Sequence, residues 1–374
     1  MILHELEVRD FRNYKSLQLT LSPDVNIFVG QNAQGKTNIL ESISMLALAK
    51  SHRTHRDSEM IRWEAERAYI AGRLARDERT YTLDLTILPK GKKARVNQVE
   101  KRKISDFVGH LNIVLFAPED LMLVKGGPQA RRRFLDVEIG QVSPHYLYNL
   151  TQYTKVLLQR NNLLKEAGKG SAKNELIQML AIWDEQMSVY AAKIISKRVS
   201  FLQRLQEFAS EIHSRITGEQ EELQLHYQSA LYRECPSPAE LPAYIFDELQ
   251  KKQKYDLQRG TTSIGPHRDD IEVWINGRNV HTYGSQGQQR TAALSMKLAE
   301  IELIRHEVGE YPVLLLDDVL SELDESRQLH LLQSMGERVQ TLITTTTTYG
   351  IEQFMREKAH VYRVREGVIT REGS

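Results

Sequence analysis

Residues 25–38 read VNIFVGQNAQGKTN, and this stretch decides the fold. Its first five residues form a short apolar run, which is typical of a buried strand. The next eight follow the pattern Gly-x-x-x-x-Gly-Lys-Thr, in which glycines let consecutive backbone N–H groups point at phosphate oxygens. Apolar residues at helical spacing follow. The sequence therefore predicts a phosphate-binding loop at residues 30–37, between a strand and a helix of an α/β fold.

The last two residues of this loop carry its chemistry. Lys36 supplies a point charge to the β- and γ-phosphates of a nucleotide, and the Thr37 hydroxyl is positioned for Mg²⁺. The helix that follows directs its positive end at the same anion.

A second motif, PVLLLDDVLSELD at residues 312–324, supplies the acidic groups that such a loop needs. Four apolar residues, 313–316, predict a buried strand that ends in Asp317 and Asp318. We expect Asp317 to hold Mg²⁺ together with Thr37, and Asp318 to orient or deprotonate the attacking water. Many buried strands end in Asp, so this motif gains its meaning from the phosphate loop.

A third motif, YGSQGQQRTAALSMKLAEIEL, begins at residue 283. Ser285 and Gly287 stand just before a helix that we expect to begin near Gln288, where free N–H groups and a hydroxyl favour an anion. The alternative interpretation is a polar loop with an ordinary helix cap.

Composition limits the class of protein. The 374 residues are 41% hydrophobic and 26% charged with a net charge of +1, so a nucleic-acid surface would have to be local. Cys235 is the only cysteine, which excludes an intramolecular disulfide. The charged N-terminus does not resemble a signal peptide, and no apolar run approaches the roughly 20 residues that span a bilayer. We expect a soluble, cytoplasmic protein.

The middle of the chain changes from mixed patterns to helical ones. From Tyr146 to about Ile216 there is no proline, and apolar residues recur at intervals of three and four: Leu176, Leu180, Trp183, Met187, Tyr190, Ile194, Phe201, Leu205, Phe208 and Ile212. This stripe, with a turn near AGKGSAKN, predicts a short antiparallel helical hairpin; an ordinary bundle is favoured over a long coiled coil. We expect a nucleotide-binding head made of residues 1–125 and 260–374, split by a helical insertion at 126–259.

The order of these motifs resembles the ATP-binding-cassette head, and the long interval between loop and acids resembles the branch that includes the structural-maintenance-of-chromosomes (SMC) proteins. Further stretches resemble the RecF family of recombination mediators: FRNYKSLQL near the start, KSHRT at 50–54, APEDLMLVKGGPQARRRFLD at 117–136, SIGPHRDD at 263–270 and GSQGQQRTAALSMKLAE at 284–300. The resemblance covers nearly the whole chain. It implies an ABC/SMC-type P-loop ATPase head interrupted by a helical insertion subdomain.

The resemblance also implies a function. Two chains would close over two ATPs with Mg²⁺, and hydrolysis would act as a switch. The dimer would bind single-stranded DNA and single-strand/double-strand junctions at gaps. It would help to load a recombinase with RecO- and RecR-type mediators, in DNA replication, repair and the SOS response.

Carried onto this sequence, the resemblance assigns residues to three roles. Catalysis falls to Lys36, Asp318 and, from the second chain, Ser285, whereas Thr37 and Asp317 bind the metal ion. Nucleotide contacts are implied for Gly30, Gln31, Asn32, Ala33, Gln34, Gly35, Lys36, Thr37, Arg12, Asn13, Gly287 and Gln288. Asp324 matches an aspartate that contacts the partner subunit.

Two positions depart from the wider cassette pattern. Asp318 stands where transporters usually carry Glu, and its shorter side chain predicts slow turnover. The histidine expected after the last core strand is absent; TTTTTYG stands there, at 344–350, and we assign that role to no residue. No clear Gln near 115–125 is present to contact Mg²⁺.

Basic residues gather in a few places, at Lys90, Lys92, Lys93 and Arg95, at Lys101, Arg102 and Lys103, and at Arg131–Arg133. The first two clusters are as consistent with DNA contact as with simple solvation, and the arginine triplet favours a structural or nucleotide-sensing role. His267, near Asp269 and Asp270, is more readily a structural hydrogen-bonding group than a metal ligand. Two alternative functions are the ATPase subunit of a transporter, which would not bind DNA, and a short SMC-like structural ATPase, which would need longer heptads.

Overall fold

The structure is a computed structural model that describes residues 1–54, 56–167, 173–235, 237–322, 328, 331, 339–347 and 359–372. These residues form two compact units, one of residues 1–121 with 293–374 and the other of residues 122–292. Each unit is considered by itself.

The first unit contains a mostly parallel sheet that carries the predicted phosphate loop. Its strand order is β15-β14-β3-β13-β12-β8, with bounds β3 (Val25–Val29), β8 (Ile113–Phe116), β12 (Val313–Asp317), β13 (Thr341–Thr345), β14 (Ala359–Arg365) and β15 (Val368–Arg371). Strands β14, β3, β13, β12 and β8 are parallel, so their carboxyl ends meet at one edge. The loop after β3 and the acids at the end of β12 therefore flank β13.

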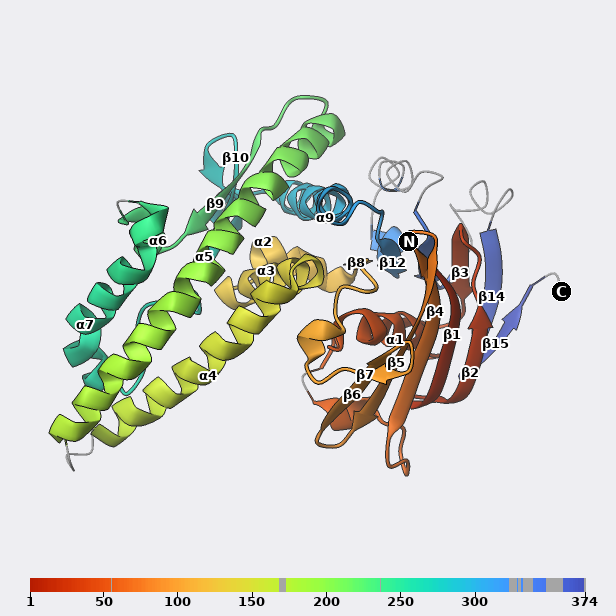
Figure 1. Cartoon of the computed structure of the whole chain (residues 1–374). Helices are drawn as coiled ribbons and strands as arrows, with labels where there is room; N and C mark the ends of the chain where they lie inside the picture. The colour runs from red at the N-terminus through yellow and green to blue at the C-terminus, as the bar shows by residue number, and fades with distance from the viewer. Residues whose placement is uncertain are drawn as a thin grey trace. The chain divides into compact units, whose positions relative to one another are not determined.

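An antiparallel sheet forms the rest of this unit, in the order β2-β1-β4-β5-β6-β7. Its strands are β1 (Ile2–Phe11), β2 (Tyr14–Thr20), β4 (Ala68–Arg76), β5 (Arg79–Leu88), β6 (Gly91–Val96) and β7 (Val99–Glu100). Helix α1 (Lys36–Leu48) contacts strands of both sheets, and Ile39, Leu40 and Ile43 on it are fully buried. Figure 1 shows α1 among these strands. The core of the unit thus lies around the helix that begins in the phosphate loop.

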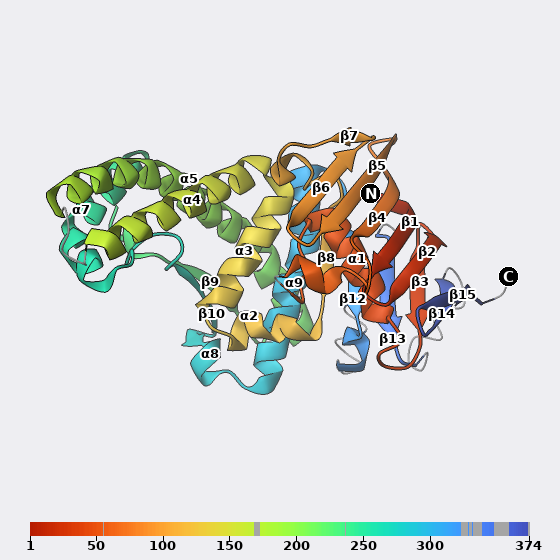
Figure 2. The ribbon, with the colours of Figure 1, turned by 90° about the horizontal axis from the view of Figure 1, so that it is seen from below.

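The second unit is built mainly of helices. They are α2 (Met122–Lys125), α3 (Pro128–Val142), α4 (Pro144–Ala167), α5 (Lys173–Thr217), α6 (Ala230–Arg233), α7 (Leu241–Arg259) and α8 (Val280–Tyr283). Helices α4 and α5 lie side by side in both views, and α7 packs on them (Figures 1 and 2). Among the described residues of the predicted stripe, Leu180, Met187 and Ile194 are fully buried. The apolar period therefore marks a bundle core, as expected.

The helical unit also holds strands, β9 (Leu223–Gln228), β10 (Asp270–Ile275) and β11 (Arg278–Asn279), in the order β11-β10-β9. Because β10 pairs with β9, residues 260–292 group with the helices, whereas the sequence placed them in the head. Neither β8 nor β9 was predicted from the sequence. Helix α9 (Gln286–Val308) begins two residues earlier than expected, which places Gly287 in its first turn.

Candidate nucleotide-binding site

The phosphate loop depends on its two glycines. Gly35 has φ +112°, and a Cβ there would lie 2.6 Å from Asn13 Nδ2. At Gly30, a Cβ would lie 2.4 Å from the backbone oxygen of Val364 on β14. A larger residue at position 30 would push against β14, whereas one at position 35 would be strained by its positive φ and would displace the Asn13 and Tyr14 side chains.

The loop ends at the N-terminus of α1, which is open to an anion. Gly35 is the N-cap residue and has no side chain to cap the helix, and the first turn contains no acidic residue. Lys36 is 6% exposed, and its Nζ donates to the backbone oxygens of Gly30 at 2.6 Å and Gln31 at 2.9 Å. The ammonium therefore lies inside the curve of the loop, where a bound phosphate would meet uncapped N–H groups and a cation.

Two neighbouring turns hold the outside of the loop. The backbone oxygen of Gln34 accepts from Asn13 Nδ2 at 3.2 Å and from the Gly367 N–H at 3.1 Å. The buried Tyr14 hydroxyl donates to the backbone oxygen of Gly35 at 3.0 Å. Asn13, predicted as a nucleotide contact, thus supports the loop; Tyr14 has the same role and was missed, although it belongs to the same FRNY stretch.

The acids of β12 meet the loop as the motifs predicted. The Thr37 hydroxyl donates to Asp317 Oδ1 at 2.9 Å, across an interval of 280 residues. The same carboxylate oxygen accepts from the Thr344 hydroxyl at 2.7 Å. Asp317 is 6% exposed, and Asp318 has φ +54°, a left-handed conformation that is uncommon outside glycine.

Burial and charge set the protonation of the site. Burial lowers the pKa of the Lys36 ammonium, and the Asp318 and Asp317 carboxylates oppose that change. Burial also raises the pKa of the Asp318 carboxyl, which Lys36 counteracts and Asp317 reinforces. A carboxylate with a raised pKa is a better proton acceptor than an exposed aspartate, which suits the role expected of Asp318.

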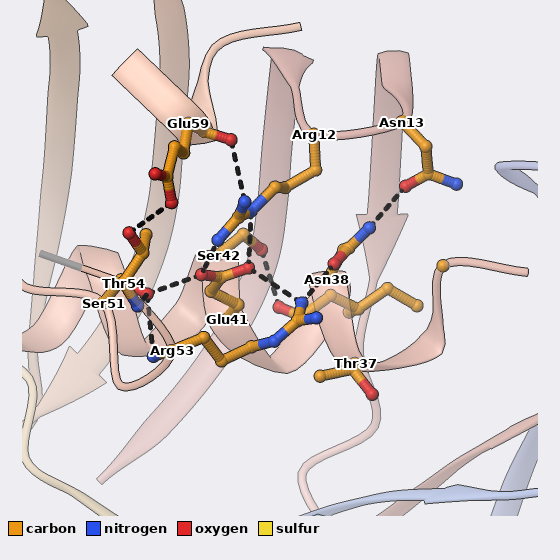
Figure 3. Close-up of polar contacts among 12 residues, drawn as sticks. Arg12, Asn13, Thr37, Asn38, Glu41, Ser42, Ser51, Arg53, Thr54 and Glu59 are labelled. Carbon is orange, nitrogen blue, oxygen red and sulfur yellow. Dashed lines mark hydrogen bonds and ion pairs between the residues drawn. The ribbon is translucent and has the colours of Figure 1, made fainter. Parts of the chain in front are cut away.

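Arg12, also predicted as a nucleotide contact, makes its contacts within the protein. Its guanidinium binds Glu41 through Nε at 2.8 Å and Nη2 at 2.6 Å, and its Nη1 donates to the backbone oxygen of Glu59 at 2.7 Å. Figure 3 shows Arg12 and Arg53 converging on the fully buried Glu41, with Arg53 also reaching Asn38 at 2.9 Å. Arg12 thereby anchors α1 through Glu41. Neither Glu41 nor Arg53 was predicted from the sequence as a site residue.

Ser285 and Gln288 lie in the second unit and form a reciprocal cap on α9. The Ser285 N–H donates to Gln288 Oε1 at 2.9 Å, and the Gln288 N–H donates to Ser285 Oγ at 3.2 Å. This is the capping-box arrangement, so the motif caps its own helix in this structure. Ser285 is exposed and Gln288 is partly buried, which keeps Ser285 accessible to a ligand.

Oxygen donors of the kind that Mg²⁺ prefers lie together at the loop. One carboxylate and one hydroxyl, from Asp317 and Thr37, suit an ion that takes few protein ligands and completes its shell with phosphates and water. The residues present therefore fit Mg²⁺. Asp324 lies outside the described residues.

The other proposed site residues have structural contacts. His267 bonds the Tyr153 hydroxyl through Nδ1 at 2.6 Å and the Thr262 backbone oxygen through Nε2 at 3.2 Å. Arg131 forms a two-bond ion pair with Asp270 at 2.7 and 2.8 Å. No group of three or more His, Cys, Asp and Glu within the described part of the chain is arranged to hold a metal ion. His267 therefore makes hydrogen bonds within the helical unit.

Comparisons with known proteins agree with this geometry. Residues 2–370 match the family model described as RecF/RecN/SMC N terminal domain. A DNA replication and repair protein RecF from an Exiguobacterium species is 50% identical over 373 residues, which is 100% of both chains. The protein of the same name from Bacillus mycoides is 49% identical over 370 residues, covering 99% of this chain and 98% of its own.

Solved structures give the same result for the fold. A structure of the recombination mediator protein RecF-ATP in the RecFOR pathway has a TM-score of 0.91 at 34% identity, covering 99% of this chain and 97% of that one. The Smc head domain of Pyrococcus furiosus with an extended coiled coil, bound to the C-terminal domain of ScpA, has a TM-score of 0.53 at 17% identity, with 99% and 95% covered. The predicted fold class, an ABC/SMC-type α/β head with helical segments inserted, is confirmed. In the part of the chain that the structure describes, no helix is long and apolar enough to cross a membrane.

Proposed function

This chain belongs to the RecF family of DNA replication and repair proteins, and we propose that it is an ATP-dependent switch that marks DNA gaps for repair. It binds ATP with Mg²⁺ at residues 30–37, closes with a second copy over two nucleotides, and hydrolyses them slowly. The transporter alternative and the SMC-like structural alternative are not favoured, because full-length relatives at about half identity are repair proteins.

One observation carries the proposal: the Thr37 hydroxyl and Asp317 Oδ1 lie 2.9 Å apart at the mouth of an uncapped helix. Residues from both ends of the chain thus combine into one oxygen site beside a phosphate-binding loop. The match to a RecF-ATP structure over 99% of this chain supports ATP as the nucleotide.

The chain's own residues divide the work. Lys36 and the N–H groups at the start of α1 bind and orient the phosphates, and Asp318, with its raised pKa, accepts a proton from water. Mg²⁺, when bound, neutralises charge that develops on the phosphate oxygens. Because the Asp318 side chain is one methylene shorter than Glu, the water is less well oriented and turnover is slow.

The second copy supplies Ser285. In this structure the Ser285 hydroxyl caps its own helix at an exposed position, and closure would let it exchange that bond for one to the partner's nucleotide. Gly287 and Gln288 lie in the first turn of the same helix and would face the same nucleotide. Dimerisation therefore depends on ATP, because Ser285 of each copy meets the partner's nucleotide only in the closed dimer.

DNA and mediator proteins complete the proposal. The RecFOR pathway named for the structural relative links that protein to RecO and RecR, and we extend this link to the present chain. The dimer recognises single-stranded DNA and single-strand/double-strand junctions without reading sequence, helps to load a recombinase and supports the SOS response in the cytoplasm.

Nucleotide binding and hydrolysis by purified protein test the proposal. Binding of a fluorescent ATP analogue is expected to fall strongly in Lys36→Ala, and hydrolysis is expected to be lost in Asp318→Asn with binding retained. Lys252→Ala, on the exposed face of α7, is the matched control and should behave as the wild type. Equal nucleotide affinity in Lys36→Ala and Lys252→Ala would contradict the proposed site.

A further inference from the structure

The threonines at 344–347 stand where the wider cassette family carries a histidine, and Thr344 has contacts that give it a role. It is 1% exposed, on β13 between the strand of the phosphate loop and the strand of the acids. In the register of the sheet it pairs with Asp317 on one side and Phe28 on the other. Neighbours in a ladder have side chains on the same face, so Thr344 and Asp317 can touch.

The Thr344 hydroxyl joins the two acids. Its proton goes to Asp317 Oδ1 at 2.7 Å rather than to the Leu316 backbone oxygen at 3.4 Å, because the shorter contact is the stronger bond. Its oxygen accepts the backbone N–H of Asp318 at 3.0 Å. A single hydroxyl thus contacts the metal-binding carboxylate and the backbone of the proton acceptor.

These contacts hold in place the two groups that the reaction depends on, the Asp317 carboxylate and the Asp318 backbone. Asp317 Oδ1 receives hydroxyl protons from Thr37 on one side and Thr344 on the other. Asp318 is held in a left-handed backbone conformation, in which its N–H faces the threonine. Without the Thr344 hydroxyl, Asp317 loses one of these two partners, and the Asp318 N–H loses the shorter of its two bonds to Thr344, keeping the one to the backbone oxygen at 3.2 Å.

We propose that Thr344 is a positioning residue that orients Asp317 for Mg²⁺ and Asp318 for water, and so sets the Mg²⁺ requirement and the rate of hydrolysis. This inference rests on the proposed ATPase site. Groups that orient metal ligands typically change metal affinity or activity by roughly 10- to 100-fold when removed, so the effect is measurable. Thr344 acts on the nucleotide only through Asp317 and Asp318, so nucleotide binding without Mg²⁺ should not depend on Thr344.

Thr344→Val, which keeps the shape and removes the hydroxyl, tests the role. We expect kcat for ATP hydrolysis to fall roughly 10- to 100-fold and the Mg²⁺ concentration for half-maximal rate to rise by a similar factor. The affinity for a fluorescent ATP analogue in EDTA should change less than about twofold. Thr344→Ser, which restores the hydroxyl, should return both kcat and the Mg²⁺ requirement to within about threefold of the wild type.

Thr341→Val is the matched control. Thr341 is fully buried on the same strand, and its hydroxyl bonds only to the Val339 backbone oxygen at 3.1 Å. It should lower stability without changing the Mg²⁺ requirement. If Thr344→Val does not fold, Thr344→Ala and Thr344→Ser measured together provide the same comparison.

Two results would overturn the inference. One is a Thr344→Val protein with the hydrolysis rate and Mg²⁺ requirement of Thr341→Val, and the other is a serine variant as impaired as the valine variant. A wild type that shows no Mg²⁺-dependent hydrolysis would instead refute the proposed function itself. The two failures are therefore distinguishable.

Discussion

At the scale of single residues, the ionisation of Asp318 makes the first prediction. Burial raises its pKa above the ordinary 3.8, and only the ionised carboxylate accepts a proton from water. Hydrolysis should therefore decline on acidification while the pH is still above 3.8, and recover as the pH rises through the raised pKa. A pH–rate profile at saturating Mg²⁺ and ATP measures this, with circular dichroism at each pH to confirm folding.

Asp318→Asn is the control for that profile. Loss of the proton acceptor should lower the rate by roughly 10²- to 10⁴-fold and remove the acidic limb of the remaining activity. A wild-type rate that stays constant down to pH 4, or an asparagine variant with wild-type activity, would contradict the role of Asp318.

The glycine at position 30 makes a second prediction. Because a Cβ would lie 2.4 Å from the Val364 backbone oxygen, Gly30→Ala must push the loop away from β14. We expect ATP affinity to fall at least tenfold, as titration with a fluorescent analogue would show. Gly127→Ala, at the N-cap of α3 in the second unit, where φ is −74° and a Cβ meets no atom within 4 Å, is the control; equal affinities in the two variants would refute the packing argument.

At this scale, the residues that could be predicted from sequence are those whose chemistry follows from a local motif. Lys36 and Thr37 follow from a local pattern, and Asp317 and Asp318 from an apolar run that ends in acids. Tyr14, Glu41 and Thr344 could not be found in this way. Their partners lie on other strands, so only the register of the sheet shows what a tyrosine, glutamate or threonine contacts.

At the scale of elements, the anchoring of α1 gives a third prediction. The Arg12 and Glu41 side chains are 18% and 0% exposed and joined by two bonds. Arg12→Lys keeps the charge but not the paired geometry, so the free energy of unfolding should fall by about 1–3 kcal/mol. Urea denaturation measures it; Arg53→Lys, whose side chain is 43% exposed, should lose less than about 1 kcal/mol. Equal losses would mean that the pair does not anchor the helix.

His267 gives a fourth prediction, concerning the helical unit. Burial first, and then nearby arginines 268, 132 and 160, lower its pKa from 6.5 to about 4. The folded state thus binds fewer protons than the unfolded state between these values, and stability is lost as the pH falls through this window. The stability advantage of the wild type over His267→Gln should shrink by roughly 2 kcal/mol between pH 7.5 and pH 5.

Asp269 requires that this be measured as a difference between two proteins. Burial raises its pKa to about 6, so its protonation favours the folded state as the pH falls, opposite to the effect of His267. Asp269 is present in both wild type and His267→Gln, so subtracting their unfolding free energies at each pH cancels its effect. A difference that does not vary with pH would show that His267 is not held neutral.

Secondary-structure elements were predictable from sequence where a hydrophobic repeat continues over many residues. The stripe over residues 176–212 forms most of α5 because an apolar face repeated over many turns has one way to be buried. Strands β8 and β9 have four and six residues, and neither leads into a motif of recognisable chemistry, as β3 and β12 do. β9 also determines where the second unit ends, since its pairing with β10 holds residues 260–292 with the helices.

At the scale of the whole molecule, the β5–β6 hairpin makes a fifth prediction. Lys90 and Lys93 are exposed, whereas Lys92 pairs with Asp57 at 2.6 Å. If the hairpin contacts DNA, Lys90→Glu/Lys93→Glu should weaken binding to gapped DNA and reduce the slope of log affinity against log salt by about 2. Fluorescence anisotropy over a salt series measures it, with Lys252→Glu/Lys254→Glu on α7 as the control. Equal slopes in the two double variants would exclude the hairpin.

The composition of the chain is compatible with a DNA-binding surface but does not show where on the protein it lies. Because the net charge is only +1, each basic cluster has to be considered separately. The structure shows that the clusters differ in their contacts. The buried Arg131 has its partner in Asp270, and Arg132 donates to the Asp269 backbone oxygen. These bonds support a structural role for Arg131 and Arg132 and leave the hairpin as the better candidate for DNA contact.

The most direct test of the central claim, that ATP joins two copies through a shared site, is sedimentation of the purified chain. Samples contain ATP or ADP with Mg²⁺, with and without a short gapped DNA, and the same series is run for Ser285→Arg. We predict dimers with ATP only, more of them with DNA, and none in Ser285→Arg. A chain that stays monomeric under every condition, or an arginine variant that dimerises like the wild type, would contradict the shared site.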